Sequence, residues 1–560
     1  MLAAYCRRFK GRSGVRLVST TMGNVDYDPE THVIRSNLSV QVPELTVSEY
    51  VWQYAHKWEH LPALTCAIRE KVYTYGEAKG ASTAFGVNLA NELDLKDGDA
   101  VALLLPNMPE FALAFLGSTS AGLVVSTANP IYTAAELGHQ FGDARVHVVV
   151  TTPELAATSR AALPDGAVVV TGDAPPPQGC LSFERLASKS TRGARVPPRP
   201  SLDSMAALPY SSGTTGKPKG VVLSHRNLVT QLCQLHHPEV FNNANREGHP
   251  QAKSLAILPL FHIYGLNAVM NLALSRGHNV VTLPRFEPGT FVRTMKKYKP
   301  NTVCVAPPLL SFLLQSPDLT REDLSELRFA VNGAAPAATS VAKGLTEKIN
   351  NPVNFILKEG FGMTEVSCCA AMTPTTQKNG VKYGSCGMNV PLSEIKVVDD
   401  AGNALPLGQT GELLFRAPNV MLGYLNNEKA TKETLLDGGW LRTGDMAYID
   451  SDGYIFIVDR LKELIKVKGY QVSPTELEET LRQIPEVLDV AVVGIPDEKS
   501  GELPKAFVVR KSEQLSKESV VQFLEGKVAP YKYLKGGVQF VNAIPRSTAG
   551  KILRKDLKSL

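Results

Sequence analysis

Short apolar segments alternate with longer helical patterns through the first part of the chain. The segments 100–105, 146–151 and 167–170 are rich in Val, Leu and Ala, and the apolar segment 109–122 lies between the first two. Strands that alternate with helices in this way are typical of βαβ units. We therefore expect an α/β fold, with a large N-terminal domain of mainly parallel sheets flanked by helices.

The pattern changes near Asp459, and the remaining residues read as a separate unit of about 100 residues, well within the size of a domain. Ser473 stands at an N-cap position, Pro474 at the first helical position and Glu476 at the third, so a helix is expected to begin here. Strands are expected at 489–495 and 505–510, and another helix at 517–526. We predict an N-terminal domain at 26–459 and a small, mobile α/β lid domain at 460–560.

The uncharged segment 111–135 raises the question of a membrane span. Gly117, Asn129 and Pro130 interrupt it, together with several Ser and Thr residues. This pattern predicts a buried helix followed by a strand and a turn, and no membrane span. The eight cysteines include no C-x-x-C pair, which is consistent with a reduced compartment.

Composition and charge change the picture only at the N-terminus. The 560 residues are 44% hydrophobic and 20% charged, as in globular proteins, and the net charge is +5. Five basic residues precede the first acid, Asp26, so the body of the chain is neutral and gives no reason to expect nucleic acid as a partner. The acid-free segment is typical of a mitochondrial presequence, which we expect at 1–25. With Met22 as the true initiator, the location would be cytoplasmic or peroxisomal.

The segment Tyr210–Gly220 carries the strongest local signal for ligand binding. It lies between two apolar strands and contains glycines, four Ser and Thr hydroxyl groups and two lysines. Glycines let the backbone approach a ligand, and hydroxyl and N–H groups donate to phosphate oxygens. Pro218 follows Lys217, so this is not a Walker A loop. A mobile Gly/Ser surface loop is the alternative interpretation.

Eight segments together identify a family. The chain resembles adenylate-forming enzymes, in the branch of acyl-CoA synthetases, 4-coumarate:CoA ligases and beetle luciferases, from about Thr46 to its end. The segments occur in the family's order: Tyr210–Val221, Leu258–His262, Asn332–Pro336, Gly360–Glu365, Gly411–Leu413, Gly439–Asp445, Asp459–Gln471 and Pro545–Lys551.

The resemblance implies a two-step reaction that uses ATP, Mg²⁺ and coenzyme A. A carboxylate attacks the α-phosphate of ATP and releases pyrophosphate, and the thiol of coenzyme A then captures the acyl adenylate. Because two anions must meet, the site needs positive charge around the phosphate and the carboxylate.

The resemblance also assigns nucleotide contacts. Thr364 matches the donor to the α-phosphate and Glu365 the Mg²⁺ ligand, although a Thr-Glu pair alone would be an ordinary helix cap. Asp445 matches the acceptor from the ribose hydroxyls, with Arg460 nearby. The triphosphate loop is implied at Ser211, Ser212, Gly213, Thr214, Thr215 and Lys219, and the adenine slot at Gly333, Ala334, Ala335, Pro336 and Phe361.

Two lysines of the tail are implied to serve different steps. Lys551 resembles the lysine that bridges the carboxylate and the α-phosphate during adenylation, and Lys466 the lysine needed in a second arrangement of the lid. Lys462 matches the hinge. Coenzyme A contacts are implied at Lys468, Gly469 and Arg285, where Arg285 replaces a commoner Lys and keeps its charge.

The acyl pocket is implied at His262, Tyr264, Gly265 and Ala268. His262 resembles the gate beside the carboxylate, and the small residues at 265 and 268 are interpreted as leaving room for an extended chain. Two residues depart from the ligase pattern: Glu359 stands where Gln is usual, and Ala268 where plant ligases often carry Ser. Both departures count against a hydroxycinnamate as the substrate.

We therefore predict an AMP-forming carboxylate–CoA ligase for a medium- or long-chain fatty acid or another hydrophobic carboxylate. The alternatives are an aromatic, 4-coumarate-type CoA ligase and a luciferase-like monooxygenase, and a catalytically silent binding paralogue is a third. Light emission with a luciferin separates the oxygenase from a ligase, and pyrophosphate release separates an enzyme from a silent paralogue.

Overall fold

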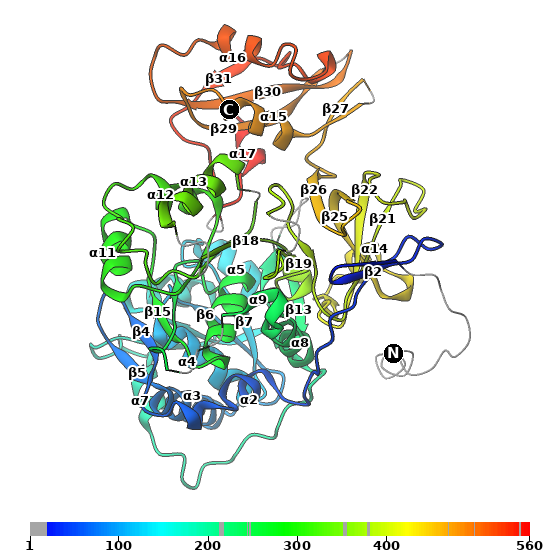
Figure 1. The fold of residues 1–560 in the computed structure, drawn as a ribbon. Helices are drawn as coiled ribbons and strands as arrows, with labels where there is room; N and C mark the ends of the chain where they lie inside the picture. Colours follow the sequence, from blue (N-terminus) through cyan, green and yellow to red (C-terminus); the bar gives the residue numbers. More distant parts are fainter. Residues whose placement is uncertain are drawn as a thin grey trace.

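The chain folds into a large domain with a small domain above it, joined near Arg460 (Figure 1). This computed structural model describes residues 20–211, 218–243, 245, 248–335, 337–350, 355–377, 381–468, 470–497, 499–547 and 550–560. Most of the predicted presequence lies outside these residues. The α/β fold and the division into a large and a small domain are as predicted.

The first sheet of the large domain follows the βαβ pattern of the sequence. Its described strands run in the order β10-β9-β8-β6-β7-β11-β13-β12, with β23 paired to β13, and the pairs from β10 to β11 are parallel. The strands are β6 (Ala100–Leu104), β7 (Val124–Thr127), β8 (Val146–Thr151), β9 (Ala167–Val170), β10 (Leu181–Ser182), β11 (Met205–Ala207), β12 (Tyr210–Ser211), β13 (Lys219–Ser224) and β23 (Gly423–Tyr424).

The second sheet is parallel in its centre and antiparallel at both edges. Its described strands run in the order β20-β19-β18-β17-β16-β14-β15-β4-β5. The strands are β4 (Pro62–Cys66), β5 (Val72–Thr74), β14 (Lys253–Ala256), β15 (Asn279–Thr282), β16 (Thr302–Val305), β17 (Phe329–Asn332), β18 (Ile356–Phe361), β19 (Ala371–Met372) and β20 (Met388–Asn389).

Helices cover the sheets of the large domain. α3 and α4 pack backbone to backbone, since a Cβ on Gly86 would lie 2.0 Å from the carbonyl oxygen of Gly117. The α-helices described in this domain are α2 (Val47–Trp52), α3 (Tyr75–Glu92), α4 (Pro109–Ser120), α5 (Ala134–Asp143), α6 (Ala156–Ala162), α7 (Phe183–Ser188), α8 (His225–His236), α9 (Pro238–Phe241), α10 (Leu272–Ser275), α11 (Pro288–Tyr298), α12 (Pro307–Gln315), α13 (Thr339–Ile349) and α14 (Glu428–Thr434).

The uncharged segment forms α4 and β7, both buried, as predicted. Of the helices that the structure describes, none has the length and apolarity to cross a bilayer.

A third sheet is antiparallel throughout, which the expectation of mainly parallel sheets did not include. N-terminal strands β1–β3 lie beside strands from the end of the large domain, as the blue and yellow ribbons of Figure 1 show. Val25 is fully buried, so the hairpin that crosses the predicted boundary at 25/26 belongs to the fold. The strands are β1 (Thr20–Met22), β2 (Val25–Tyr27), β3 (Ile34–Ser36), β21 (Glu394–Val398), β22 (Gly411–Arg416), β24 (Leu435–Leu436), β25 (Trp440–Ile449) and β26 (Ile455–Arg460).

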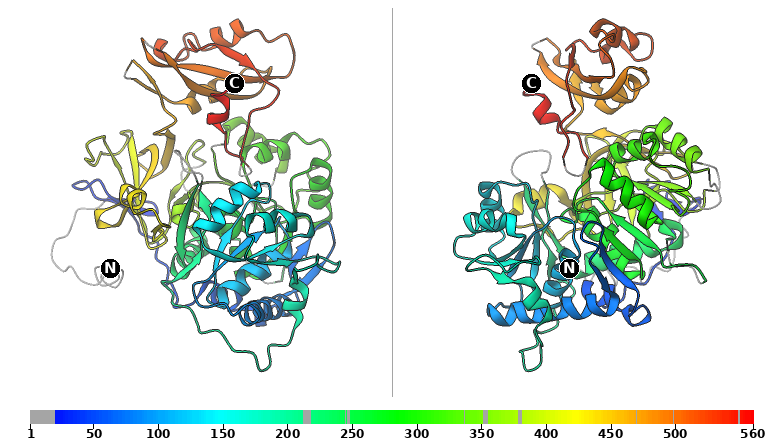
Figure 2. Two further views of the ribbon diagram at one scale, coloured as in Figure 1. Left: turned by 180° about the vertical axis from the view of Figure 1, so that it is seen from behind. Right: turned by 90° about the vertical axis from the view of Figure 1, so that its left-hand side faces the viewer.

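The small domain matches its predicted elements. The predicted helix begins at Pro474 with Ser473 as its cap, whose hydroxyl accepts from the backbone N–H of Glu476. The C-terminal segment with α17 descends from this domain toward the large one, as both views in Figure 2 show. The elements are β27 (Ile465–Val467), β28 (Tyr470–Val472), α15 (Pro474–Leu481), β29 (Val487–Asp497), β30 (Gly501–Arg510), α16 (Lys517–Phe523), β31 (Val538–Phe540) and α17 (Arg554–Leu557).

Candidate active site

Two neighbouring parallel strands bring together the residues predicted for the adenine slot. Asn332 at the end of β17 lies opposite Glu359 on β18, so the segments that follow both strands meet at one edge of the sheet. In open α/β sheets this carboxyl edge is where ligands bind. Gly333 and Phe361 lie here with Ala334, which has φ +70°, and Ala335, whose carbonyl accepts from Asn332. Pro336 lies outside the described residues.

Glu365 lies at the centre of a second cluster, beside the predicted triphosphate loop. Its buried carboxylate accepts hydrogen bonds from Tyr424 Oη at 2.8 Å and Ser211 Oγ at 3.3 Å. Lys219 Nζ lies 4.1 Å from the centre of the Tyr424 ring. The adjoining Thr364 is buried in the same turn, which spans Thr364–Val366. The structure thus joins the predicted metal ligand to the loop residues Ser211 and Lys219.

The donor set at Glu365 is compatible with Mg²⁺. A single carboxylate oxygen flanked by two hydroxyl groups offers oxygen ligands, and Mg²⁺ in nucleotide sites takes one or two carboxylates and completes its shell with phosphates and water. The predicted loop residues Ser212, Gly213, Thr214 and Thr215 lie outside the described residues.

Asp445 and Arg460 lie directly opposite each other on β25 and β26. Arg460 Nε is 3.3 Å from the Asp445 carboxylate, which is 4% exposed. Burial raises the pKa of Asp445 to about 6, against the opposing effect of Arg460 and Lys551. The carboxylate is therefore ionised at neutral pH and able to accept hydrogen bonds from hydroxyl groups, and its contact with ribose stays a prediction.

Lys551 lies on a loop of the small domain that contacts the large one. The preceding residue, Gly550, has φ +85°, and a Cβ added to it would lie 2.7 Å from the Cβ of Ala306. The backbone N–H of Lys551 donates to Ser547 Oγ at 3.1 Å, and the carbonyl of Lys551 accepts from the backbone N–H of Ser547 at 2.7 Å. Burial lowers the pKa of Lys551 to about 8, with Arg460 acting in the same direction. Lys551 thus reaches the region of Asp445.

The residues predicted for the hinge, for the second step and for coenzyme A are exposed where the structure describes them. Lys466 is exposed on β27, where its backbone N–H donates to Glu502. Lys468 is exposed with φ +50°, and Lys462 is exposed just beyond β26. Arg285 is exposed on the large domain after β15. Gly469 lies outside the described residues, so the structure does not bring the coenzyme A residues to one described site.

His262 supplies no positive charge in this structure. Its ring is partly buried, its Nδ1 accepts from the backbone N–H of Tyr264 at 3.3 Å, and burial lowers its pKa to about 4. A neutral imidazole can orient a carboxylate by hydrogen bonding, but the charge must come from another residue.

The acyl residues lie on a π-helix, Tyr264–Asn271, a form common at functional sites. Tyr264 Oη donates to the carbonyl of Val331, and its ring lies against Gly333, where a Cβ would come within 2.8 Å of Cε1. Acyl and nucleotide residues therefore adjoin. A Cβ on Gly265 would lie 2.1 Å from the carbonyl oxygen of Pro259. The interpretation that Gly265 leaves room for substrate was wrong, because the glycine is needed for backbone packing.

Ala268 is 8% exposed and lines a cavity of about 10 Å³. A space of this size holds one water molecule. It is too small for any carboxylic acid substrate, aliphatic or aromatic, so it does not distinguish between them.

Sequence reasoning missed two residues of the site. Tyr424 contacts both Glu365 and Lys219 from β23, and Glu463 forms an ion pair with Lys551. Tyr424 belongs to none of the family segments, so no signal pointed to it. Glu463 lies inside the segment Asp459–Gln471, and an acid next to a hinge lysine was the available signal.

Comparison with known proteins agrees with this arrangement. The model of the AMP-binding enzyme family matches residues 51–425, and the model of the AMP-binding enzyme C-terminal domain matches residues 476–551. A 4-coumarate-CoA ligase of Narcissus pseudonarcissus is 39% identical over 96% of this chain and 98% of its own length.

Solved structures give the same result for the fold. ATP-bound MatB from Rhodopseudomonas palustris is 28% identical with a TM-score of 0.81 and covers 92% of this chain and 99% of its own. The anthranilate CoA ligase AuaEII, in complex with anthranoyl-AMP, is 26% identical with a TM-score of 0.81 and covers 93% of this chain and 98% of its own. The chain belongs to the AMP-binding enzyme family.

Proposed function

We propose that this chain joins an aromatic carboxylic acid of the 4-coumarate type to coenzyme A. The chain is an acid–thiol ligase of the AMP-forming class, with ATP, Mg²⁺ and coenzyme A as its cosubstrate, metal and acceptor. The carboxylate displaces pyrophosphate from ATP to give an acyl adenylate, and the thiol then displaces AMP to give the thioester.

The observation that carries the proposal is the full-length similarity to 4-coumarate-CoA ligase, at 39% identity. A structural neighbour of the whole chain is an anthranilate CoA ligase, which also acts on an aromatic acid. These relatives favour the aromatic alternative over the fatty acid that the sequence analysis put first.

We propose the following roles for the side chains. Lys551, which lies near Asp445, neutralises charge between the carboxylate and the α-phosphate while Thr364 donates to that phosphate. Asp445 accepts from the ribose, and Glu365 with its neighbours Tyr424 and Ser211 holds Mg²⁺, which when bound neutralises phosphate charge. Neutral His262 orients the carboxylate. Lys466 serves the thioester step after the lid rotates.

Two departures from the ligase pattern bear on the choice of acid. Ala268 lacks the hydroxyl that plant ligases often carry, so we expect weaker selection for a 4-hydroxyl group. Glu359 lies beside the adenine residues and accepts from Asn332 Nδ2 at 2.8 Å, and burial raises its pKa to about 7. Because Glu359 contacts Asn332 next to the residues proposed for the adenine slot, we assign it to the nucleotide side and do not count it against an aromatic substrate.

Pyrophosphate release across a panel of acids tests the proposal. The panel pairs 4-coumarate, benzoate and anthranilate with saturated acids from C2 to C20, and mass spectrometry identifies each thioester. We expect the highest kcat/KM with an aromatic acid. A higher kcat/KM with a medium- or long-chain fatty acid would overturn the proposal.

A further inference from the structure

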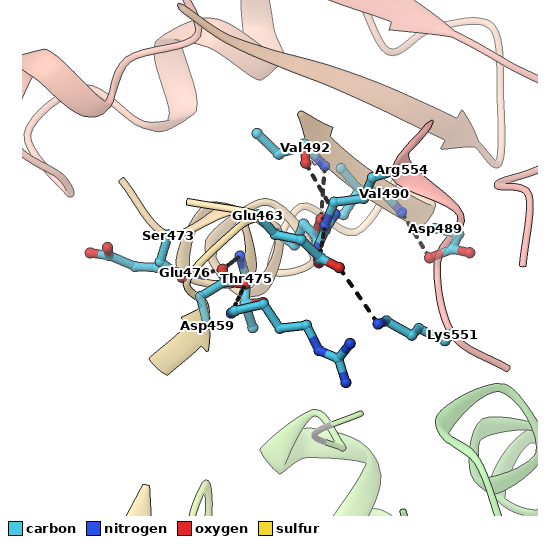
Figure 3. A network of polar contacts seen from close by, with 12 residues as sticks. Asp459, Glu463, Ser473, Thr475, Glu476, Asp489, Val490, Val492, Lys551 and Arg554 are labelled. Atoms are coloured by element: carbon cyan, nitrogen blue, oxygen red, sulfur yellow. Dashed lines mark hydrogen bonds and ion pairs between the residues drawn. The ribbon is translucent and has the colours of Figure 1, made fainter. Parts of the chain in front are cut away.

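Glu463 lies between two cations of the small domain, and neither contact belongs to the predicted machinery. Its Oε1 is 3.6 Å from Lys551 Nζ, and its Oε2 accepts from Arg554 Nε at 2.9 Å (Figure 3). Glu463 directly follows the predicted hinge position Lys462, whereas Lys551 lies near the end of the sequence. The contact therefore fixes the C-terminal loop relative to the start of the small domain.

The Glu463 carboxylate is itself held rigidly. Arg554 is 11% exposed and contacts Glu478 as well as Glu463, and its Nη1 donates to the carbonyl of Val492 at 3.0 Å. Glu478 in turn accepts from the N–H of Val492 at 2.8 Å, which ties α15 to β29. One carboxylate oxygen of Glu463 is thus anchored to a buried frame, and the other is presented to Lys551.

The charges that face Lys551 come from three segments. Asp445 on β25 and Glu463 after β26 favour the ammonium form, whereas burial and Arg460 at the end of β26 disfavour it. The pKa of Glu463 itself stays below its ordinary value, because Arg554 and Lys551 outweigh the effect of burial. Glu463 is therefore a fixed negative charge beside an ammonium group that burial would otherwise neutralise.

We propose that Glu463 is a positioning residue for adenylation, which holds the Lys551 ammonium group over the nucleotide site and keeps it protonated. Glu463 touches neither the acid nor ATP in this role and acts only through Lys551. The inference rests on the proposed function, since it requires that Lys551 takes part in adenylation.

The pH profile of pyrophosphate release by the full-length enzyme tests this role. Removal of an opposite charge within about 4–6 Å lowers the pKa of an ammonium group. Glu463→Gln should therefore move the alkaline limb of kcat/KM to lower pH by about half a unit to one unit, and reduce kcat/KM about fivefold at pH near 8.5. In Glu463→Asp, which keeps the charge, the alkaline limb should lie between its positions in wild type and in Glu463→Gln. In Lys551→Arg the limb should move beyond the measured range, because guanidinium stays charged.

A matched control separates positioning from general damage. Glu476→Gln breaks an ion pair of the same domain, between Lys532 Nζ and Glu476 Oε1 at 2.6 Å, and should leave the limb in place. Thioester formation by Glu463→Gln from supplied acyl adenylate should stay within about twofold of wild type, since Lys551 is not used there.

Three results would overturn the inference while wild-type enzyme still releases pyrophosphate. They are an unmoved alkaline limb in Glu463→Gln, the same shift in Glu476→Gln, or equal losses in both half-reactions. A wild-type enzyme that releases no pyrophosphate with any acid would instead overturn the proposed function.

Discussion

Ser473 Oγ donates a hydrogen bond of 2.7 Å to the Asp459 carboxylate, across the junction between the two domains. The same carboxylate oxygen accepts from the N–H of Thr475 at 3.0 Å. Asp459 belongs to β26, which pairs with β25 of the large domain, whereas Ser473 caps α15 of the small domain. Figure 3 shows Ser473, Thr475 and Asp459 together on one side of this network and Lys551 on the other. These bonds therefore stabilise the arrangement in which Lys551 reaches the region of Asp445.

We expect Ser473→Ala to slow adenylation several-fold more than the thioester step, because it weakens this arrangement. Loss of a cap costs about 1 kcal/mol of stability wherever it occurs. Ser516→Ala is the matched control, since Ser516 caps α16 by accepting from Ser519 and α16 lies within the small domain. Measurement of both half-reactions in both variants gives the comparison. If the ratio of the adenylation rate to the thioester rate changed equally in Ser473→Ala and Ser516→Ala, only helix stability would have been affected.

Asp445→Asn should raise the KM for ATP by about tenfold or more, since a hydrogen bond to a charged acceptor contributes about 1.5–3 kcal/mol. In wild type, kcat/KM for ATP should fall as pH drops below about 6, where Asp445 takes up a proton.

Stability gives an independent check of the same group. The pKa of Asp445 in the folded protein lies above its ordinary value of 3.8, so the folded state binds this proton more tightly than the unfolded state. The stability that Asp445 contributes below pH 4 is therefore lost as pH rises from about 4 to about 6. Asp445→Asn should lack this loss. Denaturant unfolding over that pH range measures it, and identical pH slopes in both proteins would contradict the assignment.

Tyr424→Phe should raise the Mg²⁺ concentration needed for half-maximal pyrophosphate release by several-fold. The variant removes the hydroxyl that donates to Glu365 but keeps the ring under Lys219. Tyr448→Phe removes a hydroxyl from a ring stacked on Phe456 and should have no effect on the Mg²⁺ requirement. An unchanged Mg²⁺ requirement in Tyr424→Phe would mean that Tyr424 does not support the metal ligand.

Gly550→Ala should reduce adenylation strongly and spare thioester formation from supplied acyl adenylate. The added Cβ would lie 2.7 Å from Ala306 and push the Lys551 loop off the large domain. Gly526→Ala is the control, because Gly526 has a similar φ of +72° but no neighbour within 4 Å of the added Cβ. Rate losses of similar size in the two variants would assign the effect to backbone strain alone.

The sequence was informative where periodicity or a family segment was local, and less so where distant segments meet. Alternating apolar segments predicted the parallel sheets, and the change of pattern near Asp459 predicted the small domain. The cap at Ser473 predicted the start of α15. The antiparallel sheet was missed because it pairs β3 with β21, which lies more than 350 residues later in the chain. The apolar pattern of such short strands does not show which distant strand they pair with.

The candidate site shows the same division. Family segments located Glu365, Asp445 and Lys551, and the structure brings Lys551 near Asp445. Tyr424 and Glu463 contact residues that lie far from them in the sequence, and one sequence does not reveal such contacts. Gly265 was misread because a small residue leaves room either for a ligand or for backbone, and only coordinates separate the two. Mitochondrial import and the hinge at Lys462 stay predictions.

We propose that one site runs both half-reactions and that Lys551 is used only for the first. The most direct test is the pair of half-reaction rates in Lys551→Ala: acyl-adenylate formation from ATP and acid, and thioester formation from supplied acyl adenylate and coenzyme A. We predict a loss of a hundredfold or more in the first and a change of less than about threefold in the second. Equal losses in both rates would contradict the account.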